Sequence, residues 1–297
     1  MAREISAMIH AGLIFAVCPV MAAERTAAIP DFTGGWARRA FALEQPASGP
    51  GPLHSLERSA DANTDPDPAS ISYMNLMLKP EAAEVVKKRF EATRAGTPPP
   101  SPSGSCWPMV APYIFRVQGM HLVQTKDEVL FLYMQDHQVR RVRLDGAHPA
   151  RVTPSWHGDS IGHYEGETLI VDTVGVKVGA VNMVDPAGTP YSEALHVVER
   201  YHLIDYAAAI KAEDRNIRQN GSSGNLQAAG IDDKYRGKGL QVEFRVEDPK
   251  VLNMPWSGAA TYRKSDGIWV ENVCAENVHE YYNNRDTPAP RVDKPDF

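Results

Sequence analysis

Alternating apolar and polar residues run through most of the second half of the chain and predict β-strands. The pattern is densest in residues 154–174, where two extended segments, 161–165 and 167–173, lie on either side of Gly166. A glycine between two alternating segments is typical of a tight turn. This stretch therefore predicts a β-hairpin.

Further strands are predicted on both sides of this hairpin, in segments rich in β-branched and aromatic residues that are separated by short polar breaks. They span residues 121–125, 128–135, 138–144, 193–204, 239–247, 259–263 and 268–274. A meander of roughly eight to ten strands must close or double over to hide its edges. The sequence thus predicts a mainly β protein built on an antiparallel, lipocalin-like (calycin-like) β-barrel, with a β-sandwich as the alternative.

Residues 80–95 predict the clearest helix of the chain. Apolar side chains fall on one side of this segment, Pro80 stands at a first helical position, and Gly96 ends the pattern. Ahead of it, residues 45–68 are rich in Pro, Ser, Gly and Asp and predict irregular surface that wraps the domain. Residues 31–40 predict an entry strand or a lid.

The N-terminal pattern is that of an export signal. A short apolar run ends in Val20, Met21 and Ala22, with small residues at the positions that a signal peptidase reads. The run is too short to span a bilayer, for which about 20 residues are needed. Cleavage after Ala22 predicts a periplasmic or secreted protein without membrane attachment, and a lipid anchor on Cys18 is the alternative.

A single large domain accounts for the rest of the chain. Residues 206–236 interrupt the strand pattern with a helical start and a Gly/Ser-rich end, which is typical of a lid or a mobile loop. The expected divisions are a signal peptide (1–22), an N-terminal wrapping segment with one helix (23–110), a β-barrel domain (111–282) with the excursion at 206–236, and a C-terminal tail (283–297).

Charge and cysteine content narrow the choice of partners and compartment. The formal net charge of −6 argues against a general nucleic-acid surface, which needs an excess of Lys and Arg. After signal cleavage Cys106 and Cys274 are the remaining thiols. An oxidising compartment favours a disulfide between them, with two separate buried thiols as the alternative. A homodimer is left open.

Several motifs resemble a widespread set of secreted bacterial proteins with a GDSxGxWEGDTLVVDT-type core. They are RRVRLDGAHPARVTPSW, GDSIGHYEGETLIVDTVG, SEALHVVERYHLID and VEDPKVLNMPW. The resemblance covers about residues 30–277 and departs from the shared pattern at Tyr164, where Trp is usual, and at residues 206–236, where a tight turn is expected. It implies a secreted family, and because most members have no assigned activity it implies no chemistry.

Glu199 is the most informative candidate for chemistry, because alternation places it on the apolar face of its strand. A buried carboxylate is costly unless it is paired or protonated, so Glu199 is either paired with an arginine or tuned for proton transfer. Arg140 or Arg141 is the natural partner, since the two point to opposite faces of their strand. An inward arginine can also bind a substrate carboxylate through two hydrogen bonds.

Other candidates cluster near the hairpin and along the strands. The catalytic candidates are Glu199, His196, Arg140, Arg141, His157, Asp159 and His163, and the substrate-binding candidates are Tyr133, Phe131, Trp156, Tyr201 and Tyr164. The histidine spacing matches no compact zinc motif, and the sequence has neither a G-x-S-x-G elbow around Ser160 nor a dinucleotide fingerprint. No cofactor and no metal are expected, and a hydrolase or metal-dependent enzyme remains a second alternative.

An aromatic-lined barrel with inward Arg, Glu and Tyr side chains suits a flat aromatic ligand. In plan it resembles the phenolic acid decarboxylases, in which Tyr and Arg groups hold the substrate and a carboxyl group moves the proton. This likeness is one of architecture, without a sequence match. The predicted function is a cofactor-independent, decarboxylase-like lyase for an aromatic, lignin-derived phenolic acid. A periplasmic small-molecule-binding barrel without catalysis is the alternative.

Overall fold

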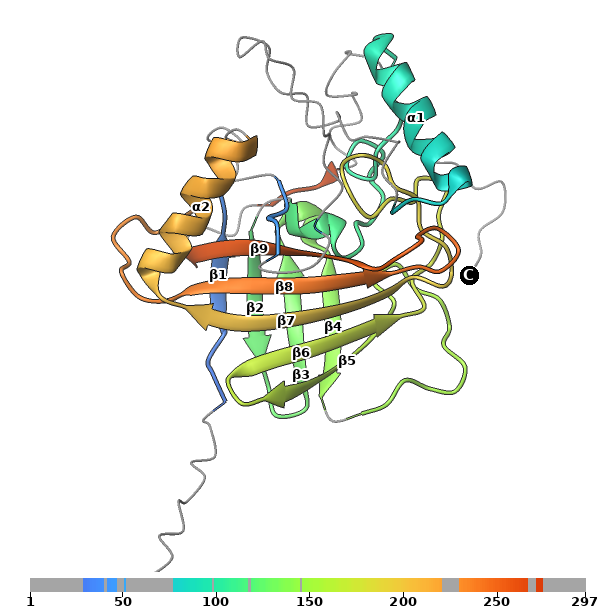
Figure 1. Cartoon of the computed structure of the whole chain (residues 1–297). Coiled ribbons are helices and arrows are strands. Elements are labelled where there is room, and N and C mark those ends of the chain that lie inside the picture. The colour runs from blue at the N-terminus through green and yellow to red at the C-terminus, as the bar shows by residue number, and fades with distance from the viewer. Residues whose placement is uncertain are drawn as a thin grey trace, which may run out of the picture.

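The chain folds into one closed β-barrel of nine strands that follow one another in sequence order (Figure 1). The computed structural model describes residues 29–39, 42–46, 51, 77–97, 99–116, 119–144, 146–220, 230–266 and 271–274. The strands are β1 (Gly34–Ala37), β2 (Met120–Gln124), β3 (Glu128–Tyr133), β4 (Val139–Leu144), β5 (Asp159–Glu165), β6 (Thr168–Val174), β7 (His196–Ile204), β8 (Gly239–Glu247) and β9 (Trp256–Ser265). The predicted mainly β barrel is confirmed, and the sandwich alternative is wrong.

The predicted hairpin is present as β5 and β6. Their antiparallel register runs from Asp159 opposite Val174 to Glu165 opposite Thr168. Gly166 lies in the turn between them at a φ of 59°, a left-handed backbone conformation that glycine adopts without steric cost. The turn residue that the sequence singled out therefore has the conformation that a tight turn needs.

One strand pair departs from the antiparallel prediction. β4 and β5 run parallel, with Val142 opposite Ser160 and Leu144 opposite Gly162, whereas the other neighbouring strands are antiparallel. Parallel strands cannot be joined by a tight turn, so the connection between them must return along the outside of the barrel. Residues 146–158 make this return, and Pro149 and Pro154 within it oppose the continuous strand that a hairpin would need.

The N-terminal region contributes both a strand and a helix. β1 pairs with β2 on one side and with β9 on the other and so closes the barrel, which settles the entry-strand-or-lid alternative as a strand. The segment that the sequence assigned to wrapping thus supplies part of the barrel wall. The predicted helix is α1 (Pro80–Arg94), which buries Ala82 and Val86.

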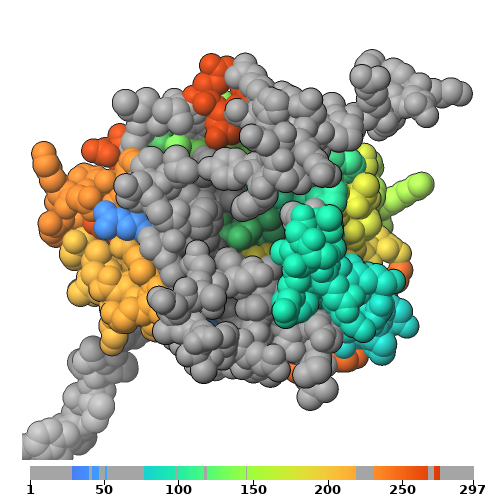
Figure 2. Space-filling model, turned by 90° about the horizontal axis from the view of Figure 1, so that it is seen from above, coloured from blue at the N-terminus to red at the C-terminus, as the bar shows by residue number. Residues whose placement is uncertain are grey.

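The helical start of the excursion is α2 (Tyr206–Asn220), which lies alongside β8 and β9. In the view from above, α1 and α2 lie on opposite sides of the molecule (Figure 2). No helix in the described part of the chain is long and apolar enough to cross a membrane. The predicted signal peptide lies outside the described residues.

Cys106 and Cys274 are paired, with 5.4 Å between their Cα atoms. The pair joins the segment between α1 and β2 to the chain beyond β9. The strand predicted at 268–274 is not seen where the structure describes this region, because residues 271–274 are irregular apart from a single 3-10 position. Residues 267–270 lie outside the described residues.

Candidate functional site

A buried ion pair occupies the inside of the barrel. Arg140, on β4, donates from Nη1 to Glu199 Oε2 at 2.9 Å and from Nη2 to Glu199 Oε1 at 2.8 Å. The two side chains are 2% and 0% exposed. Burial by itself lowers the pKa of the Arg140 guanidinium, but the charge of Glu199 reverses this and the net shift is upward. This two-pronged contact selects Arg140 over Arg141 as the inward arginine and makes Glu199 part of a pair.

Three hydroxyl groups complete the coordination of the pair. Arg140 also donates from Nε to Ser160 Oγ at 3.1 Å and from Nη2 to Thr173 Oγ1 at 2.5 Å. Tyr201 donates its hydroxyl proton to Glu199 Oε2 at 2.6 Å. Both carboxylate oxygens and all three guanidinium nitrogens therefore have partners within the protein, as a charge pair removed from water requires.

Tyr133 supplies an inward hydroxyl whose proton is not donated within this cluster. It lies on β3 and is 3% exposed. Arg140 acts on its hydroxyl oxygen, but the hydroxyl proton has no acceptor in the described part of the chain. Burial raises the pKa of Tyr133 to about 12, so the phenol keeps its proton at neutral pH. A buried group with unused hydrogen-bonding capacity calls for an explanation, and a bound ligand is one that fits.

His157 lies next to this hydroxyl-bearing ring. Its imidazole stacks on the Tyr133 ring at 6.1 Å between centroids, and it retains partial exposure to solvent. Burial, helped by the positive charge of Arg140, lowers the pKa of His157 to about 4. The ring is therefore neutral at pH 7 and can accept a proton.

The aromatic lining forms one contact series within the barrel. Phe131 lies 5.1 Å from Tyr201 and 6.3 Å from Tyr133 between ring centroids, and the guanidinium carbon of Arg140 lies 5.7 Å from the centroid of Phe131. Trp156 instead packs edge-on against Trp107 at 4.8 Å. Of the aromatic candidates, Phe131, Tyr133 and Tyr201 are brought together with the ion pair.

The remaining sequence candidates lie elsewhere on the barrel. Arg141 points outward, with its side chain 68% exposed, and pairs with Glu128. His163 is exposed and faces Glu165 at 3.3 Å. Tyr164 accepts a hydrogen bond from Gln124 Nε2 at 2.8 Å, so its hydroxyl is matched. Arg141 and His163 are not part of the inner cluster.

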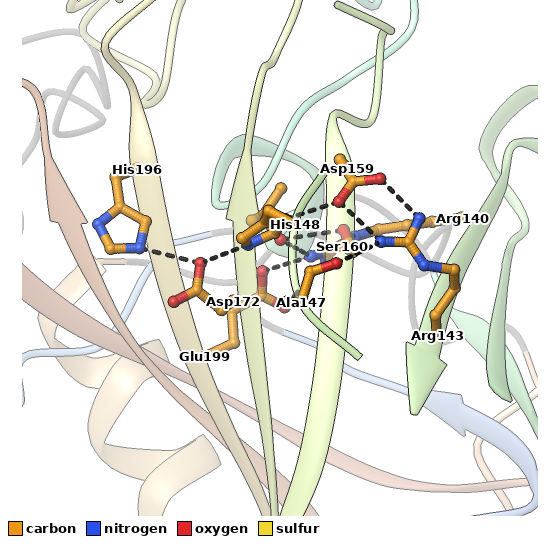
Figure 3. A network of polar contacts seen from close by, with 10 residues as sticks. Arg140, Arg143, Ala147, His148, Asp159, Ser160, Asp172, His196 and Glu199 are labelled. Carbon is orange, nitrogen blue, oxygen red and sulfur yellow. Dashed lines mark hydrogen bonds and ion pairs between the residues drawn. The ribbon is translucent and has the colours of Figure 1, made fainter. Parts of the chain in front are cut away.

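A second polar network runs across the outer wall, on the opposite face of the strands from the inner cluster (Figure 3). Arg143 contacts Asp159 at 2.7 Å, and His148 Nδ1 lies 2.6 Å from Asp159 Oδ1. His148 Nε2 lies 3.1 Å from Asp172 Oδ1, and that same oxygen lies 3.0 Å from His196 Nε2. This outer chain, Arg143–Asp159–His148–Asp172–His196, takes in two of the sequence candidates.

The pKa shifts along the outer chain follow from these contacts. The hydrogen bond from Arg143 lowers the pKa of Asp159, and the hydrogen bond from His196 lowers that of Asp172. The same contact with Asp172 raises the pKa of His196. His148 and His196 approach Asp172 from different sides (Figure 3). Within the described ranges no group of three or more His, Cys, Asp or Glu side chains is arranged to hold a metal ion.

Sequence reasoning missed His148, Asp172 and Thr173 as site residues. Alternation along β6 puts Asp172 and Thr173 on opposite faces, so each could have been assigned to one wall of the barrel. His148 lies in an irregular connection with no periodicity. Its only signal was the Gly-Ala-His-Pro motif noted above, to which no role was attached.

The fold and site define a closed, mixed β-barrel with a buried Arg–Glu–Tyr cluster and, beside it, a buried phenol whose proton has no acceptor in the described residues. The comparisons place it no further: no protein-family model, no curated protein and no solved structure matches the chain.

Proposed function

We propose that the protein is a cofactor-independent lyase for a small phenolic acid, with Tyr133 and His157 as the groups that contact the substrate. The observation that supports this proposal most directly is the buried hydroxyl of Tyr133, whose proton has no acceptor in the described residues, beside a neutral imidazole. A donor that keeps its proton and an acceptor that is free of one are the two groups that acid/base chemistry on a phenol requires.

The structure changes the roles that the sequence suggested. Arg140 is engaged on both of its terminal nitrogens, and Glu199 accepts from Arg140 and Tyr201, so neither is free to grip or protonate a ligand in this state. We therefore propose that Arg140 and Glu199 hold the inner strands in place and that the charge of Arg140 helps to keep His157 neutral. His196 lies on the outer wall and takes no part in the proposed reaction.

In the proposed reaction, neutral His157 accepts the phenol proton while Tyr133 donates a hydrogen bond to the same ring oxygen. The ring pushes electrons to the carbon that bears the carboxylate, and this carbon takes a proton from solvent to give a quinone methide. The C–C bond to the carboxylate then breaks with release of CO₂, and the electron pair of that bond restores the aromatic ring. His157 returns the phenol proton when the product forms. Each positioned acid or base contributes about 100- to 10,000-fold to rate.

A non-catalytic binding barrel is the second candidate. It is favoured by the complete internal matching of Arg140 and Glu199, because a barrel that only sequesters a ligand needs no free charged group. In that case the ligand would hydrogen-bond to Tyr133 and leave unchanged. Product analysis separates the two candidates, since only the lyase converts the ligand.

Tyr133→Phe is expected to lower turnover of phenolic acids at least about 100-fold, because it removes the substrate-facing hydroxyl and leaves the packed ring. The measurement is conversion of a panel of lignin-derived phenolic acids by chelator-treated protein. Tyr164→Phe is the matched control, because its hydroxyl is already bonded to Gln124.

Turnover should also fall as the pH drops through the His157 pKa of about 4, since the base is then protonated.

Three results would count against the lyase. Loss of turnover on chelation would point to a metal-dependent reaction. Equal activity of Tyr133→Phe and wild type would remove Tyr133 from the site. Ligand that binds the wild type and is recovered unchanged across the panel would favour the binding barrel.

A further inference from the structure

The connection between β4 and β5 is fastened to the barrel at very few points. In residues 146–155 every side chain is exposed except those of His148 and Val152. The far end is held by backbone contacts that do not titrate: Ser155 N donates to Gly175 O at 3.2 Å, and Lys177 N donates to Ser155 O at 2.8 Å. Among the described residues, the near end has two side-chain attachments: a long hydrogen bond of 3.5 Å from Arg143 Nη2 to Ala147 O, and the shorter contacts of His148.

His148 is held between carboxylates from two different strands. Nδ1 faces Asp159, on β5, and Nε2 faces Asp172, on β6 (Figure 3). An imidazole can donate to both carboxylates only when both ring nitrogens carry protons. A neutral ring would turn a lone pair toward one of the two oxygens, and that contact would become repulsive.

The outer chain has alternating charges when its histidines are protonated. Arg143, His148 and His196 are then positive and separated by Asp159 and Asp172. The groups that also act on His196 come from β8, where Glu247 raises its pKa and Arg245 lowers it. When both imidazoles lose their charge, the outer chain keeps two negative carboxylates, and Arg143 is then the one positive side chain among its five members.

We propose that His148 is a pH-dependent clasp, which holds the near end of the 146–158 connection against β5 and β6 when protonated and releases that end when neutral. The proposal does not depend on the lyase activity.

The direction of the pH dependence follows from the contacts of His148, because its ring donates to both carboxylates only when both nitrogens carry protons. The pKa shifts of the neighbouring groups act in the same direction. The pKa of His196 is raised in the folded protein, so the protonated ring stabilises the fold. This stabilisation is complete below the ordinary pKa of 6.5 and is lost as the pH rises through the raised pKa of the folded state. The pKa values of Asp159 and Asp172 are lowered in the folded protein, so their ionised forms stabilise the fold. This stabilisation is complete above the ordinary pKa of 3.8 and is lost as the pH falls through the lowered pKa values. The clasp is closed in mildly acidic solution and opens toward alkaline pH.

Hydrogen–deuterium exchange of peptides that cover residues 146–158 tests the clasp. After correction for the intrinsic pH dependence of exchange, the wild type should exchange roughly tenfold faster at pH 8.5 than at pH 5.5, the factor expected for loss of one charge-assisted hydrogen bond. His148→Gln and Asp172→Asn should exchange at the fast rate at both pH values. His163→Gln is the matched control, because His163 is also an imidazole on the outer wall of β5 but contacts Glu165 and is not a member of the Arg143–His196 network.

Retention of the wild-type pH dependence in His148→Gln would overturn the proposal. So would equal protection of the wild-type connection at both pH values, or loss of the pH dependence in His163→Gln. None of these measurements involves a substrate, so failure of the clasp and failure of the proposed activity are distinguishable.

Discussion

Replacing Glu199 with glutamine is expected to lower the free energy of unfolding by about 3–5 kcal/mol. The change keeps the side-chain shape but leaves the Arg140 guanidinium buried without a counter-charge, at a site where both partners are at most 2% exposed. It also replaces one carboxylate oxygen that accepts from Arg140 or Tyr201 by an amide nitrogen. Urea denaturation of the variant and the wild type measures the difference.

The neighbouring arginine provides the matched control. Arg141 pairs with Glu128 on the outer wall and its side chain is 68% exposed, so Glu128→Gln should change stability by less than about 1 kcal/mol. The double variant Arg140→Met, Glu199→Leu removes both charges and should be less destabilised than Glu199→Gln alone. A Glu199→Gln variant as stable as Glu128→Gln would show that the inner pair is not closed to water.

The inner cluster could largely be predicted from the strand pattern. Period-two alternation placed Glu199 on a core face, and the cost of an unpaired buried carboxylate then required a cation within reach. Because Arg140 and Arg141 are adjacent on one strand, one of them had to point inward, and the structure selects Arg140. The argument works because alternation fixes faces without needing to know which strands are neighbours.

The outer chain could not be predicted in the same way, because it depends on how strands are paired. His148 reaches Asp159 and Asp172 only because β4 and β5 run parallel and the connection between them returns along the outer wall. Alternation is the same in parallel and antiparallel strands, so it did not reveal this pairing. The same limit explains why His157, at the end of that connection, was recognised as a candidate without a location.

Removing the cross-link between Cys106 and Cys274 is expected to lower the free energy of unfolding by about 2–5 kcal/mol. The cysteines are 168 residues apart, and closing a loop of that length in the unfolded chain has an entropic effect of about 5 kcal/mol at 25 °C. The native state retains other contacts at this point, because Cys274 N donates to Asp136 Oδ1 at 3.0 Å. Removal of the cross-link should therefore act mainly by giving the unfolded chain more conformational freedom, and the barrel should stay folded at urea concentrations below the transition.

The measurement compares the protein that starts after residue 22 with its Cys106→Ser, Cys274→Ser variant in urea, each with and without reductant. Reductant should lower the midpoint of the cysteine-containing protein to that of the double variant and leave the variant unchanged. Thiol titration of the denatured, unreduced protein should find no free thiols. Two titratable thiols, or a midpoint insensitive to reductant, would mean that these cysteines contribute packing alone. The segment between α1 and β2 and the chain beyond β9 would then be held together without a covalent bond.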